Sequence, residues 1–349
     1  MLSYHHYGLY DNPFRYPEDA ESILEKEVIL ANVGGIRDEA LARIKNVFEK
    51  RTAERIIIFG ERGAGKTSLC KYIMKEFHEK NHIAIRVRGV DLDRASFHEL
   101  YLEIIKKLKT EIDKLNVHLR TTTSILTNVS IRAISKLTYK DLRKNLVNLL
   151  MELINEHDKR VFIAIDQLEN VIEEASDKEE RMIYDFLYEL IISLPIGSFL
   201  VISSLETVWE KMAEYHRDLY SGGLKVTLLN LNERGVISTI DDLREFIKAY
   251  IERKRLAEDQ LAKLGLLEKV KQNPLYPFTR ESLEIILDEL EIKNKPPRIA
   301  REIFEKILET ARQNEIRELT ASELKKIYKP LDILIEECIQ WFYREARLT

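Results

Sequence analysis

The residues whose spacing is suited to chemistry begin with glycines, a lysine and a threonine in the segment 60–67. This segment reads Gly-Glu-Arg-Gly-Ala-Gly-Lys-Thr, and it stands between an apolar run at 56–59 and a helical pattern. Small residues let backbone N–H groups turn inward around phosphate oxygens, and the next helix directs its positive end at them. We therefore predict a P-loop that binds ATP or ADP. The predicted contacts are Gly60, Glu61, Arg62, Gly63, Ala64, Gly65, Lys66, Thr67 and Ser68.

A carboxylate at the end of a second apolar run completes a predicted magnesium site. Residues 161–165 read Val-Phe-Ile-Ala-Ile and are followed by Asp166. A parallel strand that is buried on both faces needs such a run, and its carboxyl end lies beside the P-loop. Asp166 and the Thr67 hydroxyl are predicted to hold Mg²⁺, and Lys66 is predicted to reach the β- and γ-phosphates.

The elements that position these residues alternate between strands and helices up to about residue 230. Apolar runs predict further strands at 83–87, 198–204 and 224–229. Periodic patterns predict a helix that begins near Ile36 and others at 97–115, 142–155 and 180–193. Beyond residue 230, helices are predicted at 241–256, 279–290, 300–314 and 321–328 and around 341–343.

These patterns predict an α/β fold class. It consists of a parallel P-loop sheet with helices on both faces, followed by an all-helical C-terminal lid. The predicted divisions are 1–52 for an N-terminal segment with the helix before the P-loop strand, 53–230 for the core and 231–349 for the lid.

Composition and charge exclude several classes of protein. The 349 residues carry a net charge of −4, which attracts neither nucleic acid nor an anionic membrane globally. The two cysteines, Cys70 and Cys338, are isolated, so neither a zinc site nor a disulfide framework is predicted, and a reducing cytoplasm fits. No stretch approaches the ~18 apolar residues of a membrane span, and the N-terminus lacks the apolar core of a signal peptide.

The segment 114–140 is basic within this acidic chain. It contains no Asp or Glu, and its basic residues are Lys114, Arg120, Arg132, Lys136 and Lys140. A charge run of this kind is either a solvated surface or a local contact with DNA phosphates. Both interpretations stay open.

Taken together, these motifs resemble the AAA+ ATPases. They follow one another as P-loop, Asp166, a polar strand end at 203–204 and Arg298 in the helical region. Within that class, Tyr-Gly-Leu at 7–9, Asn-Pro-Phe at 12–14 and the helix within 34–44 are similar to the ExeA-like and TniB-like branch. This branch lies near the initiator ATPases of origin recognition. The resemblance covers most of residues 4–328 and implies DNA transactions, transposition or secretion without choosing among them.

The resemblance implies roles for further residues. Val33 and Ile36, in the loop before the first helix, are expected to cover the adenine. Ser203 or Ser204 takes the sensor 1 position, which detects the γ-phosphate. Arg298 starts a helix after two prolines and takes the sensor 2 position, from which it reaches the γ-phosphate. The structural alternatives are a plain turn, a helix N-cap and an arginine at a helix start.

One position departs from the pattern of the class. Most hydrolytic members place Glu directly after the magnesium-binding Asp, whereas Gln167 follows here and Glu169 stands two residues further on. Gln167 can orient a water without taking its proton, and Glu169 can act only if the backbone turns it inward. The predicted catalytic residues are Lys66, Asp166, Gln167, Glu169 and Arg298.

Two functions are compatible with these features. One is an ATP-driven switch that assembles or remodels a DNA-associated protein complex. The other is an ATP-binding adaptor that hydrolyses slowly or not at all. ATP and Mg²⁺ are the expected cofactors. The expected partners are a protein, further copies of this chain in a nucleotide-dependent oligomer, and DNA through 114–140. Arg217 lies roughly where a trans-acting arginine finger is placed. Initiators add a winged-helix domain after the lid, and residues 329–349 are too few to form one.

Overall fold

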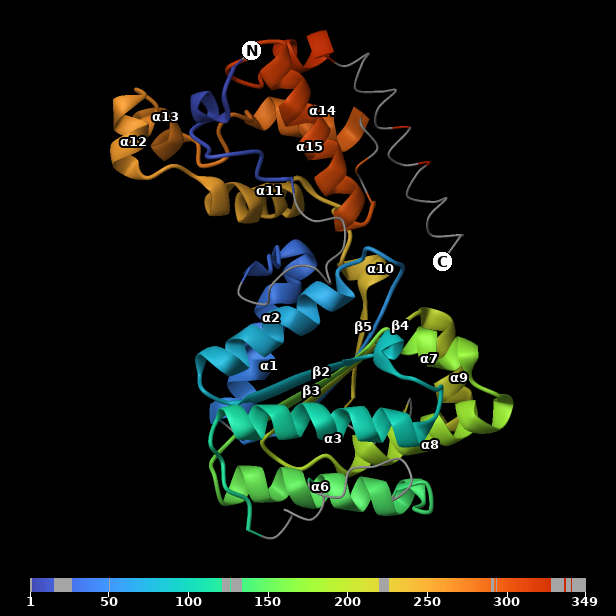
Figure 1. Ribbon diagram of the computed structural model, residues 1–349. Helices are drawn as coiled ribbons and strands as arrows, with labels where there is room; N and C mark the ends of the chain where they lie inside the picture. Colours follow the sequence, from blue (N-terminus) through green and yellow to red (C-terminus); the bar gives the residue numbers. More distant parts are fainter. Residues whose placement is uncertain are drawn as a thin grey trace.

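The structure of the protein is a computed structural model in which an α/β core and a helical lid lie one above the other (Figure 1). It describes residues 2–15, 27–49, 51–120, 126, 134–219, 226–289, 292, 294–327, 336 and 340.

The core is built on one sheet of five strands in the order β2-β3-β4-β1-β5, and all neighbouring strands are parallel. The strands are Glu54–Phe59 (β1), Ile83–Arg88 (β2), Val161–Asp166 (β3), Ser198–Ser204 (β4) and Thr227–Asn230 (β5). Every residue of β3 and β4 is buried, as expected for parallel strands covered on both faces. The carboxyl ends of β1, β3 and β4 therefore meet at one edge.

Helices cover both faces of this sheet (Figure 1). Alternate strand side chains pack with α1 (Ile36–Glu49) and α2 (Lys66–Glu79) on one face. The other side chains pack with α3 (Phe97–Lys114), α6 (Tyr139–Asn155) and α8 (Asp177–Ser193). Shorter helices follow the strand ends, namely α7 (Leu168–Glu174), α9 (Glu206–Tyr215) and α10 (Leu231–Arg234). The predicted fold class is confirmed.

The lid has its own apolar core. Its helices are α11 (Ile240–Lys254), α12 (Glu258–Lys263), α13 (Leu267–Gln272), α14 (Arg280–Glu289) and α15 (Pro297–Gln313). The long helices lie within a few residues of their predicted bounds, whereas α12 and α13 were not predicted. Residues 321–327 are helical, and the helix predicted around 341–343 lies outside the described residues.

The N-terminal segment packs into the lid rather than onto the core. Tyr7, Leu9 and Phe14 are buried in one cluster with residues of α11, α14 and α15. Leu9 forms an antiparallel bridge with Arg255, and the Phe14 ring stacks on Phe304 with 5.2 Å between ring centroids. This placement differs from the predicted division, in which residues 1–52 formed one unit outside the lid. The difference arises because the aromatic side chains complete the lid core.

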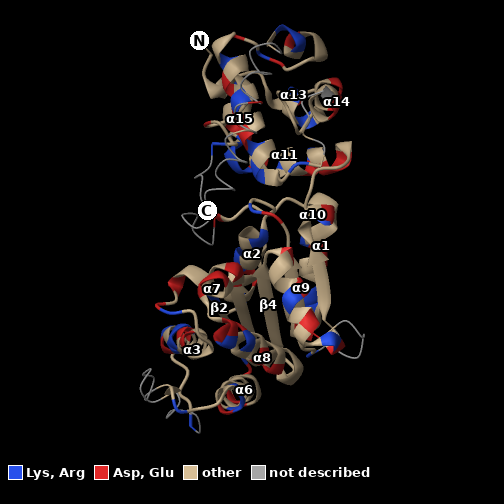
Figure 2. Ribbon diagram, turned by 90° about the vertical axis from the view of Figure 1, so that its right-hand side faces the viewer, with Lys and Arg blue, Asp and Glu red and all other residues tan. Residues whose placement is uncertain are grey.

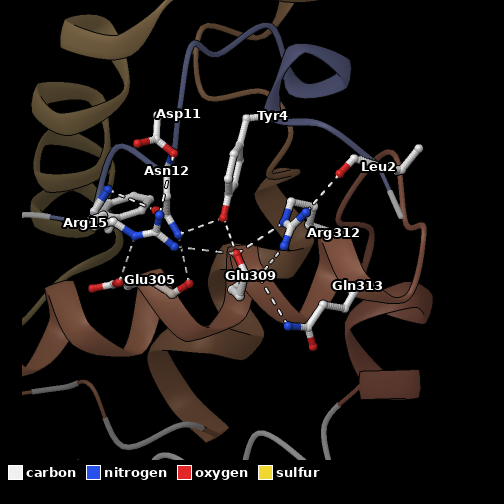
Figure 3. A network of polar contacts seen from close by, with 10 residues as sticks. Leu2, Tyr4, Asp11, Asn12, Arg15, Glu305, Glu309, Arg312 and Gln313 are labelled. Carbon is white, nitrogen blue, oxygen red and sulfur yellow. Dashed lines mark hydrogen bonds and ion pairs between the residues drawn. The ribbon is translucent and has the colours of Figure 1, made fainter.

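A polar network fastens the same segment to α15 (Figure 3). The Tyr4 hydroxyl donates to Glu309, and the Asn12 side-chain amide donates to the carbonyl of Glu305 at 3.1 Å. Hydrogen bonds from Arg312 hold the pKa of Glu309 at about 2. The lid is thus assembled from two distant parts of the sequence.

Candidate nucleotide site

A cavity of about 490 Å³ lies between the core and the lid, directly above the carboxyl edge of the sheet. The core contributes the P-loop residues 61–69, together with residues of α7 and the segment 28–36. The lid contributes Phe246, Tyr250, Pro297, Arg298 and Arg301. Every P-loop residue predicted to contact nucleotide except Gly60 lines this cavity.

The P-loop is held in shape by glycines and by its own lysine. Gly63 and Gly65 have φ values of 79° and 98°, a region that side chains with a Cβ adopt only with strain. The Lys66 ammonium donates to the carbonyls of Gly60 at 2.5 Å and Glu61 at 3.2 Å. Burial lowers the pKa of Lys66, and the nearby Glu169 and Asp166 oppose that shift. The loop therefore places a buried ammonium beside the cavity.

Asp166 lies at the centre of the polar contacts. It is fully buried at the tip of β3, on the sheet face that packs against α2. The Thr67 hydroxyl donates to its Oδ2 at 2.9 Å, and the Ser203 hydroxyl donates to its Oδ1. A hydroxyl and a carboxylate in contact are hard oxygen donors of the kind that Mg²⁺ prefers. The two predicted metal ligands fit this ion.

The strand register separates the two candidate sensor serines. Ser203 points to the same sheet face as Asp166, and its hydroxyl also accepts from the N–H of Gln167 at 3.3 Å. Ser204 points to the other face and donates to the carbonyl of Leu205 at 3.0 Å. Only Ser203 is thus joined to the predicted metal site, and its sensor role stays a prediction.

The backbone reverses sharply after Asp166. Gln167 adopts a left-handed conformation (φ 59°, ψ 45°) and caps α7, so that helix begins at Leu168. A Cβ built at Gly89 would lie 2.2 Å from the Gln167 carbonyl oxygen, which explains the glycine beside this turn. As a result, Glu169 lines the cavity and is only 4% exposed.

Glu169 carries a carboxylate that can accept a proton, whereas the side-chain amide of Gln167 cannot. Burial raises the pKa of its carboxyl, although the Lys66 ammonium acts in the opposite direction. Its Oε2 accepts no hydrogen bond from the described residues. The inward orientation that the sequence left open is therefore present in the structure.

One part of the cavity wall is apolar. It contains Val33 and Ile36, the two residues expected to cover the adenine, and the neighbouring residues Val28, Ile29, Leu30 and Ala31. Phe246 and Tyr250 of α11 line the same cavity from the lid. An apolar wall beside phosphate-binding groups suits a nucleotide, whose nucleobase would lie against the wall and whose phosphates would lie at the P-loop. The contact with adenine stays a prediction.

The turn at Gly34, in this apolar wall, is hydrogen-bonded to the lid. A Cβ at Gly34 would lie 2.0 Å from the carbonyl oxygen of Arg234, so the close approach requires glycine. The Gly34 N–H donates to Asp242 of α11 at 2.9 Å. Burial alone would raise the pKa of Asp242, but the hydrogen bonds from Gly34 and Thr239 lower it overall.

Two arginines of α15 reach the cavity, of which the sequence singled out one. Arg298 and Arg301 stand three residues apart, and both approach the carboxylate of Glu302, at 3.5 and 3.4 Å. The side chain of Arg301 is 7% exposed, against 28% for Arg298. Arg301 was missed as a site residue, although a second Arg at helical spacing after the prolines was a usable signal.

Arg86 is a further residue that sequence reasoning missed. It lies on β2, and its guanidinium donates to Asp166 Oδ2 at 3.0 Å. The signal was a charged residue inside an otherwise apolar strand run, 83–87. A buried strand tolerates such a residue only when it is paired.

Other predicted contacts lie away from the cavity. Arg217 is exposed on a 3₁₀ turn, Arg217–Leu219. Within the basic segment 114–140, residues 121–125 and 127–133, which include Arg132, lie outside the described residues, whereas Lys114, Arg120, Lys136 and Lys140 are exposed. Figure 2 shows that basic and acidic residues are interspersed along the helices of the core and the lid. Among the described residues, no helix is both long enough and apolar enough to cross a bilayer.

The parallel sheet, the P-loop and the Asp166 site together define a P-loop nucleotide-binding protein. Residues 36–202 match the family model of the AAA ATPase domain. This match, which covers 167 of the 349 residues, supports the AAA+ resemblance that the motifs indicated. No curated protein sequence matches it significantly.

The solved structures that this chain is similar to are distant in sequence. The ORC2 protein of Aeropyrum pernix is 15% identical with a TM-score of 0.49, and the alignment covers 91% of this chain and 71% of that one. Cdc6p of Pyrobaculum aerophilum is 14% identical with a TM-score of 0.47, covering 93% and 72%. A Walker-type ATPase of Pyrococcus abyssi is 15% identical with a TM-score of 0.47, covering 89% and 76%. The predicted ExeA-like or TniB-like branch remains a prediction.

Proposed function

We propose that this protein binds ATP with Mg²⁺ between core and lid, hydrolyses it, and acts as a switch that assembles or remodels a DNA-associated protein complex. The binding residues are those of the P-loop, with Lys66 released from its own loop carbonyls toward the phosphates. Thr67 and Asp166 would hold Mg²⁺, which neutralises phosphate charge when bound.

Glu169 carries the proposal of hydrolysis. A base that activates water must lie in the cavity, accept a proton and keep part of its hydrogen-bonding capacity available. Glu169 is buried in the cavity wall, and its Oε2 accepts no hydrogen bond from the described residues. Its raised pKa makes it a stronger base than an exposed carboxylate. This arrangement favours an ATPase over a non-hydrolysing adaptor, despite Gln167.

The lid arginines support the switch. Arg298 and Arg301 enter the cavity from α15, whereas the P-loop belongs to the core. A guanidinium that contacts the γ-phosphate would bind ATP and ADP differently, and only such a difference can shift the angle between core and lid.

The partners are proposed from the sequence. The basic segment 114–140 supports DNA binding through phosphate contacts. Arg217 supports a contact between neighbouring copies of the chain, because its side chain is exposed while residues beside it in the sequence pack against α8. One of these is His216, whose ring stacks on Tyr188 with 4.2 Å between ring centroids.

Steady-state ATP hydrolysis by the parent protein, with and without duplex DNA, tests this proposal. The parent is expected to turn over ATP, and Glu169→Gln to lose most of that rate while it still binds ATP. Glu173→Gln is the matched control, because Glu173 is exposed on the same helix. A parent protein that binds ATP but does not hydrolyse it would establish the adaptor instead.

The effect of DNA is a separate arm of this experiment. Duplex DNA at low ionic strength is expected to bind and to change the ATPase rate, and added salt should remove both effects. If no DNA binding occurs at low salt, the segment 114–140 is a solvated surface and the DNA part of the proposal falls.

A further inference from the structure

The Asp166 carboxylate has its hydrogen-bonding capacity filled by the protein itself. Thr67 and Arg86 donate to Oδ2 at 2.9 and 3.0 Å. Ser203 and the N–H of Gln167 donate to Oδ1, the latter at 3.1 Å. A carboxylate offers about four acceptor positions. These donors use all of them, so a cation or a cation-bound water must displace one donor to reach Asp166.

Arg86 differs from the other donors because it brings a full positive charge. It shares a sheet face with Ala84, and it stands opposite Ala164, whose small side chain leaves room for the guanidinium. The side chain of Arg86 is 10% exposed and that of Asp166 is fully buried. In such a place, an opposite charge at 3 Å acts with little screening by solvent.

The carboxylate charges around the site are offset before any ligand arrives. Asp166 and Glu169 are the two carboxylates, and both act electrostatically on Lys66. Arg86 and Lys66 are cations that offset them, and Arg62 adds a further positive charge that acts on both Lys66 and Glu169. A free divalent cation would enter a region with no net negative charge, whereas a cation that arrives with ATP brings the phosphate charges with it.

We propose that Arg86 prevents Asp166 from binding a divalent cation before nucleotide is present, so that the metal enters the site only together with ATP. This inference rests on the proposed function, since it assumes that the same site takes ATP and Mg²⁺. Arg86 is a positioning residue that acts on Asp166. The hydroxyl of Thr67 is the donor that can leave Asp166 when the cation enters, because this hydroxyl is itself a predicted ligand of the metal.

The test uses Mn²⁺ as a spin-active substitute for Mg²⁺ and follows the free-ion signal by electron paramagnetic resonance without nucleotide. The parent protein is expected to leave Mn²⁺ free. Arg86→Met removes the charge but keeps a long side chain, and it is expected to raise the Mn²⁺ affinity at least roughly tenfold. Arg86→Lys keeps the charge and should behave like the parent.

Two controls make the result specific. Arg88→Met changes an arginine on the same strand that pairs with Asp91 instead, and it should not raise the affinity. The double variant with Arg86→Met and Asp166→Asn should lose the gain, because the carboxylate that binds the ion is gone. Should Arg86→Met fail to fold, Arg86→Gln removes the charge while keeping a hydrogen-bond donor, and the same gain is expected.

The inference is overturned if the parent binds Mn²⁺ without nucleotide as tightly as Arg86→Met does, or if no neutral variant gains affinity. Arg86 would then be only a structural partner of a buried carboxylate. A separate titration of the parent with ATP in the presence of Mn²⁺ tests the proposed function. A parent that does not bind ATP contradicts that function, whereas the nucleotide-free comparison tests the role of Arg86 by itself.

Discussion

The core and the lid hold their cavity residues by different kinds of contact. In the core, Asp166 is held by hydrogen bonds and an ion pair from neighbouring strands and the P-loop helix. In the lid, Tyr250 is held by contacts with other aromatic rings. It stacks on Phe14 with 5.5 Å between centroids, and Phe14 stacks in turn on Phe304. Polar contacts are directional, so the core determines which chemistry is available. Apolar packing holds the N-terminal segment and the lid helices together.

This contrast predicts that a lid mutation acts first on stability. Phe14→Ala removes a fully buried ring from the lid cluster, and we expect a loss of about 4 kcal/mol in the unfolding free energy of the lid. Chemical denaturation followed by circular dichroism measures it. Tyr10→Ala is the control, because Tyr10 is 53% exposed in the same segment, and its effect should stay within about 0.5 kcal/mol. Equal losses in the two variants would refute the packing role.

A core mutation should act on binding without loss of fold. Lys66→Ala removes the ammonium predicted to contact the β- and γ-phosphates, and we expect roughly a 100-fold loss of ATP affinity, since hydrogen bonds to charged groups are the strong ones. Titration with a fluorescent ATP analogue measures it. Lys75→Ala, on the outer side of the same helix, should bind like the parent. Unchanged affinity in Lys66→Ala would remove the assignment of the site.

Arg298 and Arg301 test the contrast between core and lid, because they are polar residues that the lid contributes to the cavity. We expect Arg298→Ala to reduce the ratio of ATP affinity to ADP affinity roughly tenfold, with ADP affinity nearly unchanged. Arg298→Lys should be almost as impaired, since lysine lacks the planar fork of donors. The same titrations on Arg301→Ala ask whether the more buried arginine shares this role.

Arg280→Ala is the control for this pair, because Arg280 is exposed at the start of α14. If both cavity variants keep the parental ATP to ADP ratio, the lid arginines are structural and the switch has lost its mechanism.

The smallest expected effect concerns pH. Burial raises the pKa of Glu169 above the ordinary range for Glu, so its folded form holds a proton more tightly than the unfolded chain does. The unfolding free energy should therefore increase as pH falls through the window between the two pKa values, and decrease as pH rises through it. The ATPase rate should fall in the same acidic window, because the base becomes protonated.

Melting temperature as a function of pH, compared between the parent and Glu169→Gln, isolates this contribution from the other titrating groups. We expect the difference between the two proteins to vary across that window and to be constant above it. A constant difference throughout would mean that Glu169 titrates normally.

Local patterns were sufficient for much of the core. The P-loop motif at 60–67 and the apolar run before Asp166 each consist of consecutive residues. A loop around phosphates and a buried strand both require such a continuous pattern, so both could be predicted from the sequence. The fold class and the AAA+ assignment followed from the order of those patterns. In the lid, helical periodicity predicted the long helices, but it carried no information about which side chains they would meet.

The remaining features were decided by tertiary structure, for physical reasons that a linear pattern does not contain. Whether Ser203 or Ser204 meets Asp166 depends on the register of β4 against β3. Whether Glu169 faces the cavity depends on the left-handed turn at Gln167, beside Gly89.

The same holds for contacts between distant segments. The ion pair of Arg86 with Asp166 arises because β2 and β3 are neighbours and both side chains point toward α2. The position of Phe14 depends on the lid helices, which follow it by more than two hundred residues and leave an apolar space for its ring. The sequence by itself determined the P-loop, the carboxylate at the end of β3 and the layered fold, because each is a local pattern. The tertiary structure alone decided which charge, base and aromatic side chain surround them, because those contacts join residues that only folding brings together.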